Sequence, residues 1–278
     1  MVLIERRTAG GNMIQGSGTM NIIRSYQPAN GYIPVAAVGE LAEIGFGMLS
    51  LMRGMSQSFE TKEREYAFIV LSGTCSITGD ASFSNVGERP DVFSANAHTV
   101  YIPRSATVAV TAKSDVAIAV ATAPAEKKFD ARHITPAMVK SKTIGRDNWQ
   151  RTARIMLDET IEAERLFIGE AIVPSGNWAS FPPHRHDFDN LPVEVDMEEL
   201  YFFKFTRDTG FGYQRVYNDA RTIDTVALVR DNDAALIPEG YHPVSNAPGA
   251  DMYYLWIMSG RNRRFLSVID ERYQWMMK

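Results

Sequence analysis

Four residues in the second half of the chain have side chains and a spacing that can bind one metal ion. His184 and His186 are two positions apart, so on an extended strand both imidazoles point to the same face. Glu199 begins a later apolar run and adds a carboxylate oxygen. His242 follows Pro238-Glu-Gly240, a turn signal that can bring a third imidazole from a distant strand. This ligand set suits Zn2+, Mn2+, Fe2+, Co2+ or Ni2+, whereas Mg2+ and Ca2+ prefer oxygen.

Strands must position these side chains, because the sequence contains many short apolar runs and few helical patterns. The runs are rich in Val, Ile, Phe and Tyr and are separated by turn-forming residues. Two segments, 135–139 and 159–164, have a weak helical pattern. Many short strands with turns between them predict an all-β sandwich or barrel. We expect strands over residues 67–71, 99–102, 107–111, 117–121, 166–173, 199–205, 212–217, 225–229, 234–237 and 252–258.

The strand pattern occurs twice along the chain. Glu65-Tyr-Ala-Phe-Ile-Val resembles Glu199-Leu-Tyr-Phe-Phe-Lys, and Tyr101-Ile-Pro103 resembles Leu236-Ile-Pro238. The two pairs are 134 and 135 residues apart, about half of the 278-residue chain. Two pairs that agree to one residue indicate two copies of one β domain.

The repeat suggests how the chain divides. We predict an N-terminal domain over residues 1–130 and a C-terminal domain over 131–278, with a charged linker from about 124 to 147. Thr107 stands in the first copy where the second has His242. We therefore expect a degenerate N-terminal domain that binds no metal and a C-terminal domain that does.

Other residues compete for the metal. Glu198 precedes Glu199, and we prefer Glu199 because its counterpart in this repeat register is Glu65. His98 and His133 have no partners at ligand spacing, so we interpret them as structural or exposed residues.

Composition excludes several classes of protein. The chain carries 29 basic and 33 acidic residues, a net charge of −4, without the basic footprint of a nucleic-acid binder. Its single cysteine, Cys75, excludes an intrachain disulfide framework and a Cys-rich zinc site. No run approaches the ~20 apolar residues of a membrane span, and residues 1–7 lack a secretory pattern. We expect a soluble cytoplasmic protein with neither a nucleic-acid nor a membrane partner.

The ligand motifs resemble those of a known superfamily. His-x-His, Glu and Pro-x-Gly-x-His-xxx-Asn, ending at Asn246, look like the two cupin motifs, and the repeat looks like a bicupin. More narrowly, the chain from Trp149 to Trp256 resembles the 5-deoxy-glucuronate isomerase family of bacterial inositol breakdown, which is related to 5-keto-4-deoxyuronate isomerase of pectin breakdown. The stretches that carry this resemblance are Ser175-Gly-Asn-Trp178, Phe181-Pro-Pro-His-Arg-His-Asp187, Glu198-Glu-Leu-Tyr-Phe-Phe, Gly210-Phe-Gly-Tyr-Gln-Arg-Val-Tyr217, Val229-Arg-Asp231, Pro238-Glu-Gly-Tyr-His-Pro-Val244 and Tyr253-Tyr-Leu-Trp256.

The resemblance implies two jelly-roll-like β-barrels in tandem and a metal-dependent aldose–ketose isomerase. The implied reaction converts 5-deoxy-glucuronate to 5-dehydro-2-deoxy-gluconate in myo-inositol catabolism, with zinc as the first choice of metal. We also expect a homo-oligomer with a small sugar-acid substrate. The alternatives are the pectin-pathway isomerase, a metal-binding cupin sensor, and a dioxygenase that uses Fe2+. No basic helical segment supports a DNA-binding sensor.

The implied reaction needs a base that shuttles a proton and a group that binds the substrate carboxylate. Glu198, Tyr217 and Glu239 are the candidates for the base, and a metal-assisted hydride shift is the alternative. A guanidinium fork matches a carboxylate, and Arg215 is our first choice for it. Tyr254 is a candidate for bonding the sugar hydroxyls.

The sequence departs from the family pattern at two points. It has Asn232 where the family has Gly in the turn before the last ligand strand, and Asn tolerates the left-handed backbone that such a turn needs. The gap between the His-x-His pair and Glu199 is also longer than in the cupin pattern. This insertion predicts an extra loop near the mouth of the site.

Overall fold

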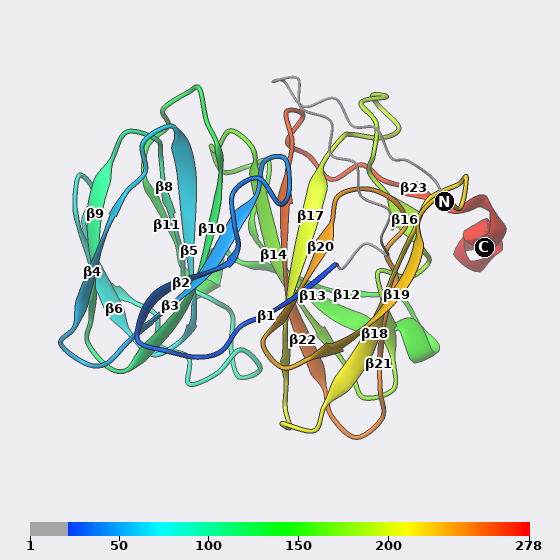
Figure 1. Ribbon diagram of the computed structural model, residues 1–278, viewed down its shortest axis with the longest axis horizontal. Coiled ribbons are helices and arrows are strands. Elements are labelled where there is room, and N and C mark those ends of the chain that lie inside the picture. The colour runs from blue at the N-terminus through cyan, green and yellow to red at the C-terminus, as the bar shows by residue number, and fades with distance from the viewer. Residues whose placement is uncertain (1–21) are drawn as a thin grey trace.

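The two halves of the chain fold into two antiparallel β-barrels that lie side by side (Figure 1). This computed structural model describes residues 22–278, so the N-terminal segment on which the cytoplasmic expectation rests lies outside them. No helix among the described residues is long and apolar enough to cross a membrane.

The N-terminal barrel packs a six-stranded sheet, β11-β8-β5-β10-β3-β2, against a four-stranded sheet, β4-β9-β6-β7. The apolar cluster between the sheets takes side chains from both, as alternation along the strands requires. Its strands are β2 (Gly31–Ala36), β3 (Gly45–Leu51), β4 (Ser56–Glu60), β5 (Arg64–Ser72), β6 (Cys75–Gly79), β7 (Phe83–Val86), β8 (Thr99–Ile102), β9 (Thr107–Ala112), β10 (Val116–Pro124) and β11 (Arg132–Ile134).

The C-terminal barrel packs a seven-stranded sheet, β1-β20-β17-β22-β14-β13-β12, against a four-stranded sheet, β15-β21-β18-β19. The pair β16-β23 lies outside both sheets. The strands are β1 (Ile23–Ser25), β12 (Lys140–Ile144), β13 (Arg151–Leu157), β14 (Leu166–Val173), β15 (Trp178–Ala179), β16 (His184–Arg185), β17 (Glu198–Phe205), β18 (Phe211–Tyr217), β19 (Asp224–Arg230), β20 (Asp233–Ile237), β21 (Val244–Asn246), β22 (Met252–Ser259) and β23 (Val268–Ile269).

Every predicted strand is present, but both helical predictions need correction. Within 135–139 there is only the short 3-10 helix η1 (Pro136–Met138), and 159–164 forms turns and loop. Two other 3-10 helices, η2 (Asp147–Trp149) and η3 (Glu271–Met277), complete the described elements. Asn232 adopts the expected left-handed backbone, with a φ of 66°.

The predicted linker is not a plain connection. It contains β11, which pairs with β8 of the N-terminal sheet, and β12, which pairs with β13 of the C-terminal sheet. The strand β1 also pairs with β20, so a segment from the start of the chain joins the C-terminal sheet. By strand pairing, the change of barrel falls after Ile134.

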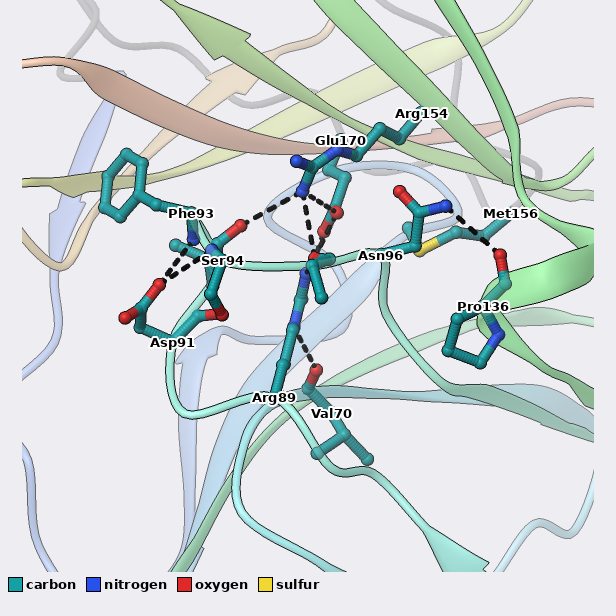
Figure 2. A network of polar contacts seen from close by, with 12 residues as sticks. Val70, Arg89, Asp91, Phe93, Ser94, Asn96, Pro136, Arg154, Met156 and Glu170 are labelled. Atoms are coloured by element: carbon teal, nitrogen blue, oxygen red, sulfur yellow. Dashed lines mark hydrogen bonds and ion pairs between the residues drawn. The ribbon is translucent and has the colours of Figure 1, made fainter.

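The two large sheets pack face to face through a third apolar cluster, which includes Phe46, Ile69, Leu200 and Leu255. The strands at this interface are buried on both faces, which explains why β10 and β22 are almost continuously apolar. The interface also holds a polar network, in which Arg89 reaches from the N-terminal barrel to Glu170 on β14 (Figure 2). The guanidinium makes two hydrogen bonds to this carboxylate, at 2.9 and 3.0 Å, and both side chains are buried.

Two carboxylates link the barrels in a reciprocal way, and we call them the exchanged carboxylates. Glu65 on β5 accepts the backbone N–H groups of residues 164–166, just before and at the start of β14. Glu198 on β17 accepts those of residues 42–44, just before β3. Each barrel thus fixes the entry to a central strand of the other, and the need for residues 164–166 in this extended role explains the absence of a helix there.

This reciprocity corrects the repeat register. Tyr66 pairs with Ile102 in the first barrel, and Glu199 pairs with Ile237 in the second. Tyr66 is therefore the counterpart of Glu199, and Glu65 is the counterpart of Glu198. The sequence comparison aligned Glu65 with Glu199, one residue away from its structural counterpart Glu198. It did so because both barrels carry a glutamate at this point that accepts backbone N–H groups of the other barrel.

Candidate metal centre

The structure brings the four predicted ligands to one place inside the C-terminal barrel. Nε2 of His186 and Nε2 of His242 lie 3.2 and 3.1 Å from Oε2 of Glu199. Their potential ligand atoms all lie within 4.8 Å of one another. The His184 ring centroid is 4.8 Å from that of His242, so the fourth predicted ligand borders the same cluster.

Backbone carbonyl groups orient the three imidazoles. Nδ1 of His242 donates to the carbonyl of Gly240 at 2.8 Å, and Nδ1 of His186 donates to the carbonyl of Met197. His184 has its Nδ1 3.4 Å from the carbonyl of Pro182. Because a carbonyl only accepts, Nδ1 carries the proton and Nε2 is left as the electron-pair donor, which is the usual arrangement of metal-binding histidines.

A short strand pair, a long central strand and a loop hold these residues. His184 lies on β16, which pairs with β23 of the C-terminal segment, where His184 is opposite Ile269. Glu199 lies on β17 in the middle of the seven-stranded sheet. His242 lies between β20 and β21, where its backbone carbonyl accepts a 2.8 Å hydrogen bond from Gln214.

Electrostatics favours an ionised Glu199 and a neutral His184, whereas for His186 the lowering of the pKa by burial is outweighed by the hydrogen bond and charge of Glu199, which raise it. Burial raises the pKa of Glu199, but hydrogen bonds and charge from His186 and His242 outweigh it and lower the pKa to about 2. Burial and the two neighbouring histidines lower the pKa of His184 to about 3. At neutral pH the site therefore offers an ionised carboxylate and a neutral His184 imidazole.

A metal ion fits this site. Nε2 of His242 is buried and has no hydrogen-bond partner, although the Glu199 carboxylate is near. A buried nitrogen that lacks a partner is costly unless a ligand satisfies it. Three nitrogens and one carboxylate oxygen are the donors that divalent ions of the zinc and manganese type use.

The cluster opens into a cavity of about 400 Å³. His184, Glu199, Tyr201 and Tyr254 line it, together with residues of strands β12, β13 and β14. Cross-strand register places Lys142, Ala153, Ala171 and Tyr254 in one row on the inner face of the sheet. The two alanines at the centre of this row leave the space that larger side chains would fill.

Hydroxyl groups and cations surround the cavity. The Ser180 hydroxyl lies 2.6 Å from the Tyr201 hydroxyl, and the Tyr201 and Tyr254 rings are 4.5 Å apart. The cations are Lys140, Lys142 and Arg151. This wall can bind a small polyhydroxylated anion.

Tyr254 is the one residue of the predicted catalytic and substrate-binding set that lines the cavity. Glu198 is an exchanged carboxylate and faces the other barrel. Tyr217 donates to Asp270 at 2.7 Å, which steadies the segment next to β23. Arg215 is paired with Asp224 at 2.8 Å on the outer sheet, and Glu239 does not line the cavity.

The inserted loop between Asp187 and Glu198 contributes no residue to the lining of the cavity. Asp187 accepts the backbone N–H of Gly240 at 2.8 Å, so this part of the loop supports the turn before His242.

Sequence reasoning missed Arg151, Lys142, Ser180 and Tyr201 as cavity residues. Lys142 lies within the predicted linker of residues 124–147, and Tyr201 lies within the strand predicted over 199–205. Lys140, Lys142 and Ile144 are spaced two positions apart, as residues on one face of a strand are. This spacing could have indicated a shared face for the two lysines.

Two β-barrels in tandem, one with a His/Glu cluster at its interior cavity, define a bicupin with one candidate metal centre. The sequence pattern of the KduI/IolB family matches residues 29–276, and the chain belongs to this family.

Similar proteins support the assignment. A 5-deoxy-glucuronate isomerase of Geobacillus kaustophilus is 38% identical over 84% of this chain and 86% of its own length. One from Bacillus subtilis strain 168 is 33% identical over 92% of this chain and 97% of its own. An IolB-like protein from Salmonella typhimurium LT2 has a crystal structure with a TM-score of 0.88 and 30% identity, covering 93% of this chain and all of that one.

A more distant structure shows the fold alone. The oxalate decarboxylase of Lactobacillus farciminis, a formate complex, has a TM-score of 0.65 at 12% identity, covering 91% of this chain and 90% of that one. Together these matches confirm the predicted family, the bicupin fold and the enzyme class, an isomerase.

Proposed function

We propose that this protein converts 5-deoxy-glucuronate to 5-dehydro-2-deoxy-gluconate with the help of one divalent metal ion, for which zinc is the first choice. The proposal places the protein in cytoplasmic myo-inositol breakdown. The observation that carries it is the buried cluster of His186, Glu199 and His242, bordered by His184, at the end of a cavity lined by hydroxyls and cations. The names of the similar proteins supply the substrate.

His184, His186, Glu199 and His242 would hold the metal. When bound, it would supply Lewis-acid polarisation of the substrate carbonyl and hold the neighbouring hydroxyl. The chain itself orients the sugar, because the hydroxyls of Ser180 and Tyr201 line the cavity beside Glu199.

The proton must be moved by a group that reaches this cavity. The carboxylates that line it besides Glu199 are Asp158 and Glu159. Asp158 is engaged by Lys140 at 2.5 Å and by Thr160. Glu159 is exposed and makes no such pair, so it is our first candidate for the base, ahead of the residues proposed from sequence.

The direct test is an isomerisation assay with zinc-loaded protein on both 5-deoxy-glucuronate and 5-keto-4-deoxyuronate, with dissolved oxygen recorded. We expect ketose formation from 5-deoxy-glucuronate without oxygen uptake. Preference for the pectin-derived acid would instead support the related isomerase, and oxygen uptake would support a dioxygenase.

A further inference from the structure

We propose that Arg151 and Lys142 form the subsite that binds the carboxylate of the substrate, in the same cavity that His184 and Glu199 line. This inference rests on the proposed function, because it assigns the two ends of a sugar acid to two groups of residues that line the same cavity.

Strand register places the two cations on one wall. Lys142 on β12 is opposite Ala153 on β13, and Arg151 on β13 is opposite Ile144. Cross-strand partners share a face of the sheet, so both cations lie on the face that lines the cavity. In the seven-stranded sheet, β14 and β22 separate β13 from the strand that carries Glu199. The small Ala153 lies between, which leaves room for a ligand that spans the cavity.

The partners of these two cations set them apart from other basic residues. Among residues 22–278, neither Arg151 nor Lys142 forms an ion pair with a carboxylate. Lys140 on the same wall is neutralised by Asp158, and Arg215 by Asp224.

Arg151 is held in place by backbone groups alone. Its Nη1 donates to the carbonyl of Phe181 at 3.0 Å and to that of Trp149 at 3.3 Å. Its guanidinium has five N–H groups, so these contacts fix the fork while donors remain. Burial lowers the pKa of this guanidinium, which an anionic partner would counter. A fixed fork with donors to spare is suited to bidentate binding of a carboxylate.

The site therefore has a cationic part, at Arg151 and Lys142, and a metal-binding part, at the His/Glu cluster. A carboxylate held at Arg151 and Lys142 would direct the opposite, aldehyde end of the chain to the His/Glu cluster. The same contact would discriminate against neutral aldoses, since an uncharged end group cannot replace a charge-assisted pair.

The test compares acid and neutral substrates in Arg151→Gln and Lys142→Gln. We expect Arg151→Gln to raise KM for 5-deoxy-glucuronate by about 10- to 100-fold, as expected for loss of a charge-assisted pair. Zinc content and turnover of the analogue that has a hydroxymethyl group in place of the carboxylate should change little. Arg151→Lys should recover part of the affinity, because it keeps the charge and loses the fork. Arg207→Gln, an exposed arginine in the β17–β18 turn, is the matched control.

A binding measurement separates this inference from the proposed reaction. Glucuronate, added to zinc-loaded protein in a calorimeter, should bind Arg151→Gln at least about 10-fold more weakly than wild type. If this difference appears while neither sugar acid is isomerised, the subsite stands and the proposed reaction fails. Equal binding by folded Arg151→Gln, Lys142→Gln and wild-type protein, or a loss in Arg215→Gln instead, would overturn the subsite.

Discussion

Glu198 and Glu199 show how strand alternation gives neighbouring residues different tasks. Both are buried and both lie on β17, but successive side chains point to opposite faces of a sheet. Glu199 faces the barrel interior and meets the imidazoles of His186 and His242. Glu198 faces the N-terminal barrel and accepts three backbone N–H groups. The choice of metal ligand is therefore decided by the face on which each carboxylate lies.

The first prediction concerns the ligands. His184→Ala and His242→Ala should each bind far less zinc than the wild type, which we expect to hold about one ion per chain. Metal content after dialysis, measured by mass spectrometry, checks this. His98→Ala is the control, since His98 lies in the other barrel and contacts His133. Full metal content in both variants would contradict the assignment of His184 and His242 as metal ligands.

The pair His98 and His133 leads to a prediction about pH. Their ring nitrogens are 2.8 Å apart, and burial lowers the pKa of both below the ordinary value of 6.5. The unfolded chain therefore takes up more protons than the folded protein as the pH falls below about 6.5, and stability falls with it. The stability that the neutral pair contributes is fully present above about pH 6.5. It is lost as the pH falls towards the lowered pKa values that the two histidines have in the folded protein.

The His98→Gln/His133→Gln variant should show a smaller loss of unfolding free energy between pH 7 and pH 5 than the wild type. Urea denaturation of metal-free protein at several pH values measures the difference. Parallel pH profiles for the two proteins would show that the pair does not titrate as described.

At the scale of elements, short segments next to the long strands build the site. β12 and β13 form the cationic wall, and β16 is held by β23 from the end of the chain. The long central strands β14, β17 and β22 are buried by the opposite barrel on one face. They carry Glu199, Tyr201 and Tyr254, while β12, β13 and β16 add the cations and His184.

The exchanged carboxylates give a prediction at this scale. Glu65→Ala and Glu198→Ala should each lower the free energy of unfolding by about 3–5 kcal/mol, because each buried N–H that loses its acceptor costs roughly 1–3 kcal/mol. Guanidinium denaturation measures the change. Glu60→Ala, at the exposed end of β4, should stay within about 0.5 kcal/mol of the wild type. Exchanged-carboxylate variants as stable as this control would contradict the reciprocal linkage.

Ten strands were predictable because they are apolar runs bounded by turn signals, whereas short or polar strands such as β12 and β16 carry no such pattern. The helical pattern at 159–164 failed because Glu65 holds the following residues extended, a tertiary contact that no local pattern encodes. The prediction of a plain linker over residues 124–147 was wrong for a similar reason. The strand β12 in this segment is polar along its exposed face and becomes a strand only by pairing with β13.

The whole molecule is held together by an interface that combines apolar packing with a buried polar network. Arg154 on β13 reaches Glu170 at 3.2 Å, beside the two contacts from Arg89 (Figure 2). β13 carries the cationic wall and β14 borders it, so the N-terminal barrel supports the site although none of its residues lines the cavity. The expected absence of metal in that barrel stays a prediction. It is supported by Tyr66, which takes the place of Glu199 and packs among aromatic rings.

Breaking this network should destabilise the whole protein. Arg89→Met should lower the free energy of unfolding by about 3–5 kcal/mol, because it leaves the buried Glu170 with Arg154 alone. The double variant Arg89→Met/Glu170→Leu should recover part of this loss. Thermal or urea unfolding of the two variants and the wild type forms the comparison, and a change below about 1 kcal/mol in Arg89→Met would contradict the account.

The fold and the metal cluster were largely predictable, whereas the substrate wall was not. His-x-His and the turn before His242 are local patterns, and their spacing carries the chemistry. Arg215 was chosen because it lies in a family-like stretch, but its strand faces outward and Asp224 pairs with it. Which cations meet in a cavity depends on sheet order and register, and these are set by contacts across the whole chain. The expected homo-oligomer stays a prediction.

The most direct measurement is a titration of metal-free protein with zinc while ketose formation from 5-deoxy-glucuronate is followed. Activity should be absent at the start, rise with each addition and stop rising at about one ion per chain, as a single four-ligand site requires. Added zinc should produce no such rise in His242→Ala. Full activity in rigorously metal-free wild type, or in His242→Ala, would contradict the central claim.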